Sequence, residues 1–454
     1  MARKPVITLL CSTLLLALGP ARAEDAKAAT EDEVIVKPMS TATYIDAGQI
    51  VNGWNEDLRQ DFEMQFLSRT SVWLMQEGTI NKRLDIKMGV GGVFWYVLPE
   101  QDGAPHTRLI KFGPGIRQAQ LTYHFGDLDH PWLDLQAGYF PFKYNPDASN
   151  LGEYLLRSGT YPGFLVTGGW NIVNSAVYMA QGLNASFNFW DGRLKTSLLL
   201  PMERDNPPMH SISPTLITSV KPVDAIEIGG GVTWNHGISV KPSKETPKGS
   251  AAGIGYTTAI IKEVIGDSVI RDTTQFYTFQ GFKAMGRVSF DPKAFFSSDL
   301  FNPNDLKIFA EVAVLGVKNY SFYYDNIKNR MPIMFGMNVP TFKILDLLSV
   351  QGEFYDHKFK NNIEAVYEYQ WPIWYVKDYD PANVNDARTA SEVKRDRWNW
   401  SVLARKDVTK GVKLWVQAAN DHLRTFDYNT KPVKVPITTR PTDWYYLFRL
   451  EFGL

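Results

Sequence analysis

The sequence has almost no cysteine and no surplus of charge of either sign. Its 454 residues include one cysteine, Cys11, and 48 basic residues balance 48 acidic ones. A chain with zero net charge has no global basic field, so we expect no nucleic-acid partner. Because Cys11 lies in a segment that we expect to be removed, no disulfide is available to the rest of the chain. Burial and hydrogen bonding must hold it together.

Long apolar runs are missing as well. After residue 23 no stretch approaches the roughly 18 uninterrupted apolar residues of a spanning helix, so helical membrane spans are excluded. A closed barrel of strands is then the remaining way for this chain to cross a membrane.

The N-terminal segment has the three parts of a secretory signal peptide. Arg3 and Lys4 precede the apolar run Val6–Leu18, and the small-residue pattern Ala21-Arg22-Ala23 follows. An uncleaved membrane anchor is the alternative, although the run is shorter than the roughly 20 residues that a spanning helix needs. We expect residues 1–23 to be the signal peptide, 24–40 a flexible lead-in and 41–454 one outer-membrane barrel domain.

Mass spectrometry of the mature protein should therefore place its N-terminus at Glu24, because cleavage follows the Ala-x-Ala pattern. A retained Met1 would remove the export argument on which the expected outer-membrane location depends.

Apolar residues alternate with polar or small residues along the whole chain, which is typical of strands with one apolar face. The clearest case is Leu84–Val90. The same period of two runs through Phe62–Phe66, Ala119–Phe125, Leu133–Tyr139, Leu183–Phe189, Ile226–Trp234, Leu348–Phe354, Trp398–Val402, Val412–Ala418 and Trp444–Leu454.

Strand length separates a membrane barrel from a soluble sandwich. Sandwich strands are usually about 5 to 6 residues long, whereas a transmembrane strand needs about 9 to 11. Many segments here reach the longer value, and aromatic residues, which make up 13% of the chain, recur near segment ends as in an interfacial girdle. We expect an all-β, transmembrane antiparallel up-and-down barrel.

Connection lengths alternate, as they do in bacterial barrels with short periplasmic turns and longer external loops. Short connections include Gly78–Lys82, Gly126–Pro131 and Trp190-Asp191-Gly192-Arg193, and long ones include Pro141–Gly169 and His236–Thr273. The count gives about 16 strands, within a range of about 14 to 18, and both chain ends lie on the short-turn side.

Three segments resemble Gram-negative outer-membrane porins. Asp134–Lys143 resembles a "Gly-aromatic-Phe, then Pro-Phe" segment of phosphate-selective-type porins, and Leu347–Tyr355 and Leu414–Asn420 resemble late porin strands. The ending Phe452-Gly453-Leu454 resembles the C-terminal strand that barrel assembly reads, although that signal normally ends in Phe. The resemblance implies a porin-like barrel and does not imply selectivity for phosphate.

Catalytic motifs are not apparent. The chain has 7 histidines but neither a Gly-x-Ser-x-Gly elbow nor a His-Glu-x-x-His motif, so we expect no enzyme, no cofactor and no metal site. Gly229-Gly230-Gly231 lies within a strand segment, where a kink or close packing against an inserted loop is expected instead of a phosphate cradle.

The connection Pro141–Gly169 is the most informative segment. Its many apolar residues are unusual for a loop in water, and Glu153 and Arg157 stand four apart, on one face of a short helix. One interpretation is a pore constriction in which Glu153 and Arg157 face the aqueous path. The other is a loop packed over the external mouth, with both charges solvated.

Strand parity predicts which polar residues line the lumen. Both signs of charge occur among them, so anion selectivity is not expected. The predicted pore-lining residues are Glu63, Arg69, Asp85, Lys87, Arg117, His124, Asp134, Arg287, Arg405 and Arg449, with Lys195, Glu227, Lys283, Glu353, Lys413 and Glu451 at the same parity.

The sequence therefore predicts an outer-membrane channel for passive diffusion of small hydrophilic solutes, selective by diameter and lumen charge. Its expected partners are outer-membrane lipid, the barrel assembly machinery and those solutes, and a homotrimer is the oligomeric state considered. The alternatives are a structural or adhesive barrel with ligand-binding loops and a soluble exported carbohydrate-binding β-sandwich.

Overall fold

The computed structural model describes residues 33–55, 60–97, 111–159, 165, 178–203, 210–238, 256–265, 268–278, 280–296, 298–317, 326–356, 398–420 and 442–453. The predicted signal peptide, 1–23, and the first part of the predicted lead-in lie outside these residues. Within them, no helix has both the length and the apolar character to cross a membrane.

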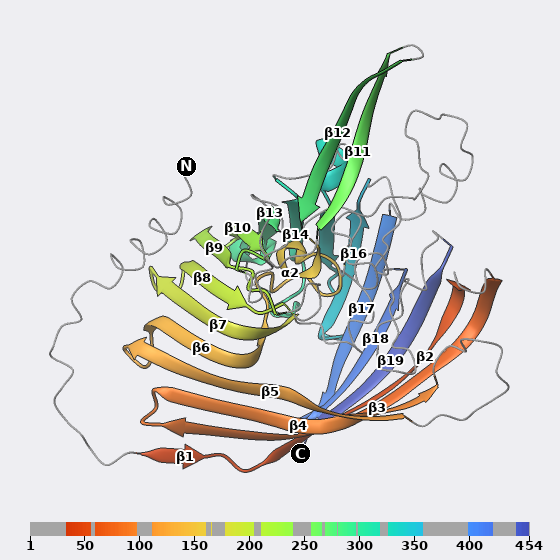
Figure 1. Cartoon of the computed structure of the whole chain (residues 1–454). Coiled ribbons are helices and arrows are strands. Elements are labelled where there is room, and N and C mark those ends of the chain that lie inside the picture. The colour runs from red at the N-terminus through yellow and green to blue at the C-terminus, as the bar shows by residue number, and fades with distance from the viewer. Residues whose placement is uncertain are drawn as a thin grey trace.

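Antiparallel strands form a closed ring that makes up most of the described structure (Figure 1). The ring begins with β2 (Ser40–Asn55), β3 (Gln60–Ile80), β4 (Leu84–Val97), β5 (Lys111–Gly126), β6 (Pro131–Phe142), β7 (Tyr178–Phe189), β8 (Leu194–Pro201), β9 (Thr215–Val223) and β10 (Ile226–Asn235). It continues with β13 (Gly281–Phe290), β14 (Ile308–Val314), β15 (Ile333–Asn338), β16 (Leu347–Phe354), β17 (Trp398–Thr409), β18 (Val412–Ala419) and β19 (Trp444–Gly453).

The ring closes where the last strand meets the first. Each strand pairs with its neighbour in the chain, β10 pairs with β13, and β19 pairs with β2 through Arg449 opposite Asp46. The described residues thus form a 16-strand up-and-down barrel, as the sequence predicted.

Short and long connections alternate around the ring. The turn between β7 and β8 has positive φ at Trp190, Asp191 and Gly192, the left-handed geometry that an Asp-Gly hairpin signal predicts. The first residues of β2 and the last residues of β19 lie together at the short-turn end. Strand order and the positions of the connections follow the prediction.

Three strands lie wholly or partly where the sequence predicted none. β1 (Val34–Val36), within the predicted lead-in, pairs with Gly78–Ile80 of β3. β11 (Tyr256–Ile265) and β12 (Ser268–Thr278) form a separate two-stranded sheet in the predicted loop His236–Thr273 and project away from the ring (Figure 1). The Gly266-Asp267 pair between them is a hairpin signal that the connection-length argument did not use.

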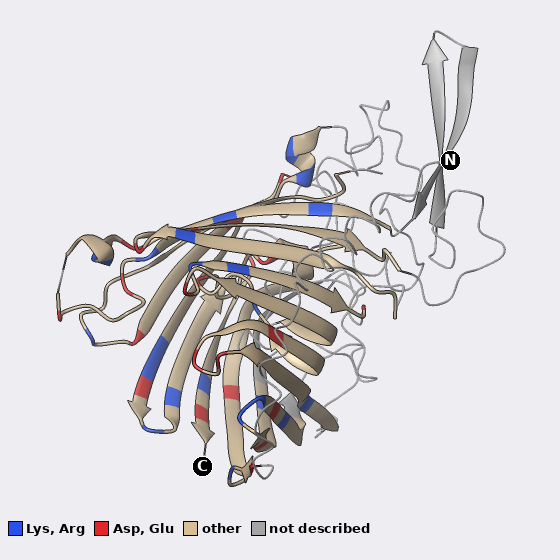
Figure 2. Ribbon diagram, turned by 90° about the vertical axis from the view of Figure 1, so that its left-hand side faces the viewer, with Lys and Arg blue, Asp and Glu red and all other residues tan. Residues whose placement is uncertain are grey.

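The barrel has apolar side chains on its outer surface and polar side chains inside, the reverse of a soluble protein. Val72, Val90 and Ile228 are exposed on the outer face, whereas Ser71 and Gln120 are buried on the inner one. Most of the length of the strands in Figure 2 is uncharged. An apolar outside around a polar inside is the arrangement that a surrounding bilayer and an aqueous lumen favour.

Candidate functional site

The connection after β6 folds back into the ring. It contains one helical turn, α2 (Tyr154–Arg157), which Figure 1 shows among the strands. The leucine and tyrosine residues of this connection that the structure describes are buried, with Leu151, Tyr154, Leu155 and Leu156 among them. They form one cluster with inward-facing residues from both sides of the ring, including Phe140, Ala180, Leu199, Ile217, Met285, Phe309, Ala313 and Met334.

Two charged residues of the barrel wall bind the two ends of α2. Glu311 on β14 accepts hydrogen bonds from the Tyr154 backbone N–H at 3.0 Å and the Tyr144 hydroxyl at 2.7 Å. Lys283 on β13 donates from Nζ to the carbonyl oxygens of Leu155 at 2.6 Å and Ser158 at 2.8 Å. The unpaired N–H and C=O groups of a short helix are therefore satisfied by opposite charges on the wall.

Further polar groups attach the loop along its length. Gln351 on β16 accepts from the backbone N–H groups of Asn150 at 3.0 Å and Leu151 at 3.1 Å. The Tyr154 hydroxyl donates to Glu353 at 2.9 Å. Burial and the neighbouring Glu353 carboxylate raise the pKa of Tyr154 well above its ordinary value, so its hydroxyl stays protonated and remains a donor.

Glu153 is buried within the same connection. Its side chain accepts a hydrogen bond from the Tyr144 backbone N–H at 3.1 Å and pairs with Arg157 at 3.3 Å. Only 1% of Glu153 is exposed, and burial raises the pKa of its carboxyl, against the influence of Arg157. Glu153 thus shapes the loop from within, and Arg157 is the member of the predicted constriction pair that retains exposed surface.

Gly231, in the glycine run of β10, faces the same loop. A Cβ at Gly231 would lie 2.8 Å from Cδ1 of Leu155 and 3.0 Å from the Leu216 carbonyl oxygen, so any larger residue would require the Leu155 side chain to shift. This is the close packing against an inserted loop that the sequence predicted.

A second group of inward side chains surrounds the closure of the ring. Arg69 on β3 and Arg449 on β19 both pair with Asp46 on β2, at 2.9 Å and 2.6 Å. Arg449 and Arg117 lie over the ring of Tyr44, 4.7 Å and 4.8 Å from its centroid, and Arg117 also donates to the Tyr44 hydroxyl. We call Arg69, Arg117 and Arg449 the arginine cluster.

A guanidinium group also stacks on an aromatic ring in the neighbouring strands. Arg405 on β17 lies 5.5 Å from the ring centroid of Trp415 on β18, whose Nε1 donates to Glu451 at 2.9 Å. Lys413 pairs with the same Glu451 carboxylate at 3.6 Å. Stacked guanidinium groups are held in position, so their charge has a fixed place on the wall.

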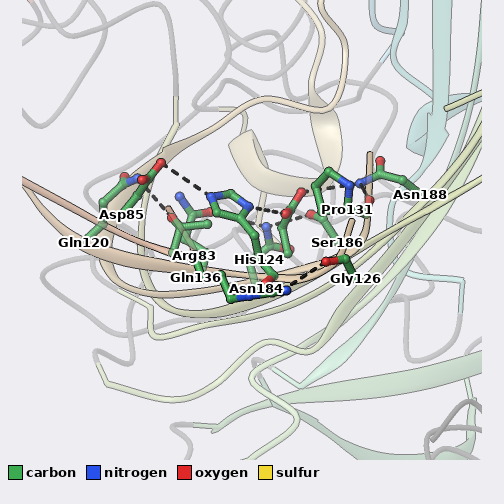
Figure 3. Close-up of polar contacts among 12 residues, drawn as sticks. Arg83, Asp85, Gln120, His124, Gly126, Pro131, Gln136, Asn184, Ser186 and Asn188 are labelled. Carbon is green, nitrogen blue, oxygen red and sulfur yellow. Dashed lines mark hydrogen bonds and ion pairs between the residues drawn. The ribbon is translucent and has the colours of Figure 1, made fainter. Parts of the chain in front are cut away.

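A third polar group lies on β4, β5 and β6 (Figure 3). His124 Nδ1 lies 2.6 Å from Asp134 and Nε2 lies 3.4 Å from Asp85, which accepts from Thr79 at 2.9 Å. The side chain of His124 is 23% exposed, in contrast to the inward residues under the loop. Solvent therefore reaches the inner face of β4–β6 at the short-turn end of the ring.

The remaining predicted lumen residues are distributed around the wall. Arg287 and Glu227 form an ion pair between β13 and β10, Lys195 is exposed and Lys87 is partly exposed. The side chain of Glu63 lies outside the described residues. Across the part of the chain that is described, no three histidine, cysteine or acidic side chains are grouped so that they could hold a metal ion.

Several residues of these groups were missed by the sequence prediction. Glu311 and Gln351 alternate with apolar neighbours in their strands, so the parity rule alone would have placed them inside. Tyr44, Asp46 and Trp415 also have the inward parity, but nothing in the sequence shows that their strands meet.

Comparison with known proteins gives structural likeness only. No protein-family model matches the chain, and no curated protein matches it. A triple mutant of the Rhodopseudomonas blastica porin is 8% identical over 92% of this chain and 100% of its own, with a TM-score of 0.41. OmpF of Salmonella typhi, in a complex with daunomycin, is 9% identical over 93% and 98%, with a TM-score of 0.44. The strand order of the described residues independently shows a closed 16-strand up-and-down barrel.

Proposed function

We propose that the protein is a channel in the outer membrane of a Gram-negative cell, through which small hydrophilic solutes diffuse passively. The observation that carries this proposal is the unequal filling of the ring. The loop with α2 packs against the inner faces of β6–β9 as well as those of β13–β15, whereas His124, Asp85 and Asp134, near the short-turn ends of β4–β6, keep accessible polar surface. A solute path that reaches these residues would select by diameter and by wall charge.

Swelling of liposomes that contain the purified protein tests this function. Liposomes in isotonic solutions of sugars of increasing size should swell quickly with the smallest sugar and progressively more slowly with larger ones. Liposomes with the same amount of folded barrel that do not swell with any sugar would contradict diffusion through the lumen.

A barrel that binds a partner through its external connections is the second candidate. The hairpin β11–β12, which projects from the ring, favours it (Figure 1). In that case the lumen would serve only as a support for the loops. The liposome measurement separates the two candidates because only the channel admits sugars.

The arginine cluster gives the proposed channel a charge preference. Arg69 and Arg449 share one carboxylate, Asp46, and Arg117 lies over the Tyr44 ring, which leaves a local excess of positive charge. A unit charge about 8 Å from an ion changes its energy by about 0.5 kcal/mol in water, roughly twofold in the permeability of that ion and in opposite directions for an anion and a cation. We therefore expect Arg117→Gln to lower the chloride-to-potassium permeability ratio by up to about fivefold at low salt.

The reversal potential across a bilayer with a potassium chloride gradient measures this ratio. Arg193→Gln is the matched control, because Arg193 lies in an exposed turn and pairs with Asp224 at 2.9 Å. A ratio that Arg117→Gln leaves unchanged, or that both variants lower equally, would show that the arginine cluster does not set ion preference.

A further inference from the structure

Two connections at the short-turn end present a group of exposed apolar side chains. Phe295 is 72% exposed at the end of the 3-10 turn η1 (Pro292–Phe295), between β13 and β14. Phe342 and Ile344, between β15 and β16, are 59% and 73% exposed. We call Phe295, Phe296, Leu300, Phe301, Phe342 and Ile344 the aromatic foot.

Ring contacts join the two connections into one surface. Phe301 lies 5.9 Å from Phe296 and 5.9 Å from Phe342, measured between ring centroids. Phe295 lies 6.1 Å from Phe290, the last residue of β13. Since Phe290 alternates with buried Ser289, it belongs to the outer face of the barrel, and the aromatic foot continues that face.

The backbone holds these side chains outward. Asn302 Nδ2 and the Thr341 hydroxyl both donate to the Leu345 carbonyl oxygen at 2.7 Å, which ties the two connections together. Phe342 and Lys343 have φ angles of 51° and 65°. Positive φ is unfavourable for a bulky residue and persists where the surroundings impose it, often at sites with a function.

The neighbouring chemistry fits a lipid surface. Lys343 is exposed beside Phe342 and Ile344, and aromatic rings next to a lysine are typical of the boundary between headgroups and acyl chains. The β3–β4 turn at the same end of the barrel is different, because it consists of Asn81, Lys82 and Arg83. Trp190 in the β7–β8 turn and Val408 in the β17–β18 turn are exposed singly, at 68% and 60%, so the β13–β16 sector differs in joining several exposed aromatic side chains through ring contacts.

We infer that the aromatic foot inserts into the headgroup region of the periplasmic leaflet and anchors this sector of the barrel to phospholipid. The inference rests on the proposed membrane location. It adds that contact with lipid extends beyond the strands to two connections, which a barrel with purely aqueous turns would not show.

Spin labels at single cysteines test the insertion. The sequence has no cysteine after Cys11, so Phe295→Cys, Phe342→Cys, Lys82→Cys and Met88→Cys each give one labelling site. The variants are reconstituted in phosphatidylethanolamine and phosphatidylcholine vesicles, with assembly verified by heat-dependent gel mobility. Collision of each label with oxygen, which concentrates in lipid, is compared with collision with a water-soluble nickel chelate.

The labels at positions 295 and 342 should have a severalfold higher ratio of oxygen to nickel collision than the label at position 82. A ratio equal to that of position 82 would overturn the inference, and so would protection from both reagents, which indicates contact with a second protein copy. The label at position 88, on the outer face of β4, reports on the membrane location itself. If it is also in water, the proposed function fails together with the inference; if it alone is in lipid, only the inference fails.

Discussion

A variant that lacks Ser149–Ser158 should conduct more current per channel than the intact protein. The deleted residues include α2 and the four buried apolar residues Leu151, Tyr154, Leu155 and Leu156. Their removal should raise the conductance, because ions then use the cross-section that the loop occupied.

The same deletion should leave the barrel assembled. Strand pairing does not involve residues 149–158, and Glu311 and Lys283 would exchange their loop contacts for water in an aqueous lumen. In a dry core the same deletion would leave two buried charges unpaired and destabilise the fold by several kcal/mol. Unchanged conductance from a barrel with normal heat-dependent gel mobility would show that the loop does not restrict the path.

The charge of the loop gives a finer test of the same constriction. Arg157→Glu places a second acid beside Glu153, which now pairs with Arg157 at 3.3 Å. We expect ion preference to move towards cations, because Arg157, the member of the pair that retains some exposed surface, changes sign. An unchanged reversal potential in an assembled barrel would show that ions do not pass near Arg157.

The substitution with the largest expected effect on assembly is Met88→Arg. Met88 is 53% exposed on the outer face of β4, between its partners Gln76 and Ala119. An arginine at the bilayer midplane of a barrel costs about 2–4 kcal/mol, a large part of the stability of a typical domain. The folded fraction of Met88→Arg on a cold gel after refolding into vesicles should therefore fall strongly.

Lys87→Gln is the matched control, since Lys87 is the neighbouring residue and has the inward parity. It removes a charge from a wall that water reaches, and such lumen changes are tolerated. Equal folded fractions for Met88→Arg and Lys87→Gln would mean that the two faces of β4 have been assigned wrongly.

The fold could be predicted from the sequence because each strand carries its own apolar face. Leu84–Val90 shows the alternation without reference to any partner, and the connections supply the order of strands independently. The hairpin β11–β12 was not predicted because its connection is long enough to be a single external loop, although the Gly266-Asp267 hairpin signal lies inside it.

The candidate site was less predictable because it depends on contacts between distant segments. The four-residue spacing places Glu153 and Arg157 on one side of a helical turn, but it cannot show that this turn packs against β13 and β14. The arginine cluster likewise depends on Asp46, which meets Arg449 only because β2 and β19 close the ring.

The most direct test of the channel is the current through the purified protein in a planar lipid bilayer. We expect the conductance to increase in steps as single channels insert. The size of each step should be proportional to salt concentration, except at low salt, where the charged wall also affects it. Protein that inserts as a folded, heat-modifiable barrel and produces no steps would contradict an open aqueous path beside the loop.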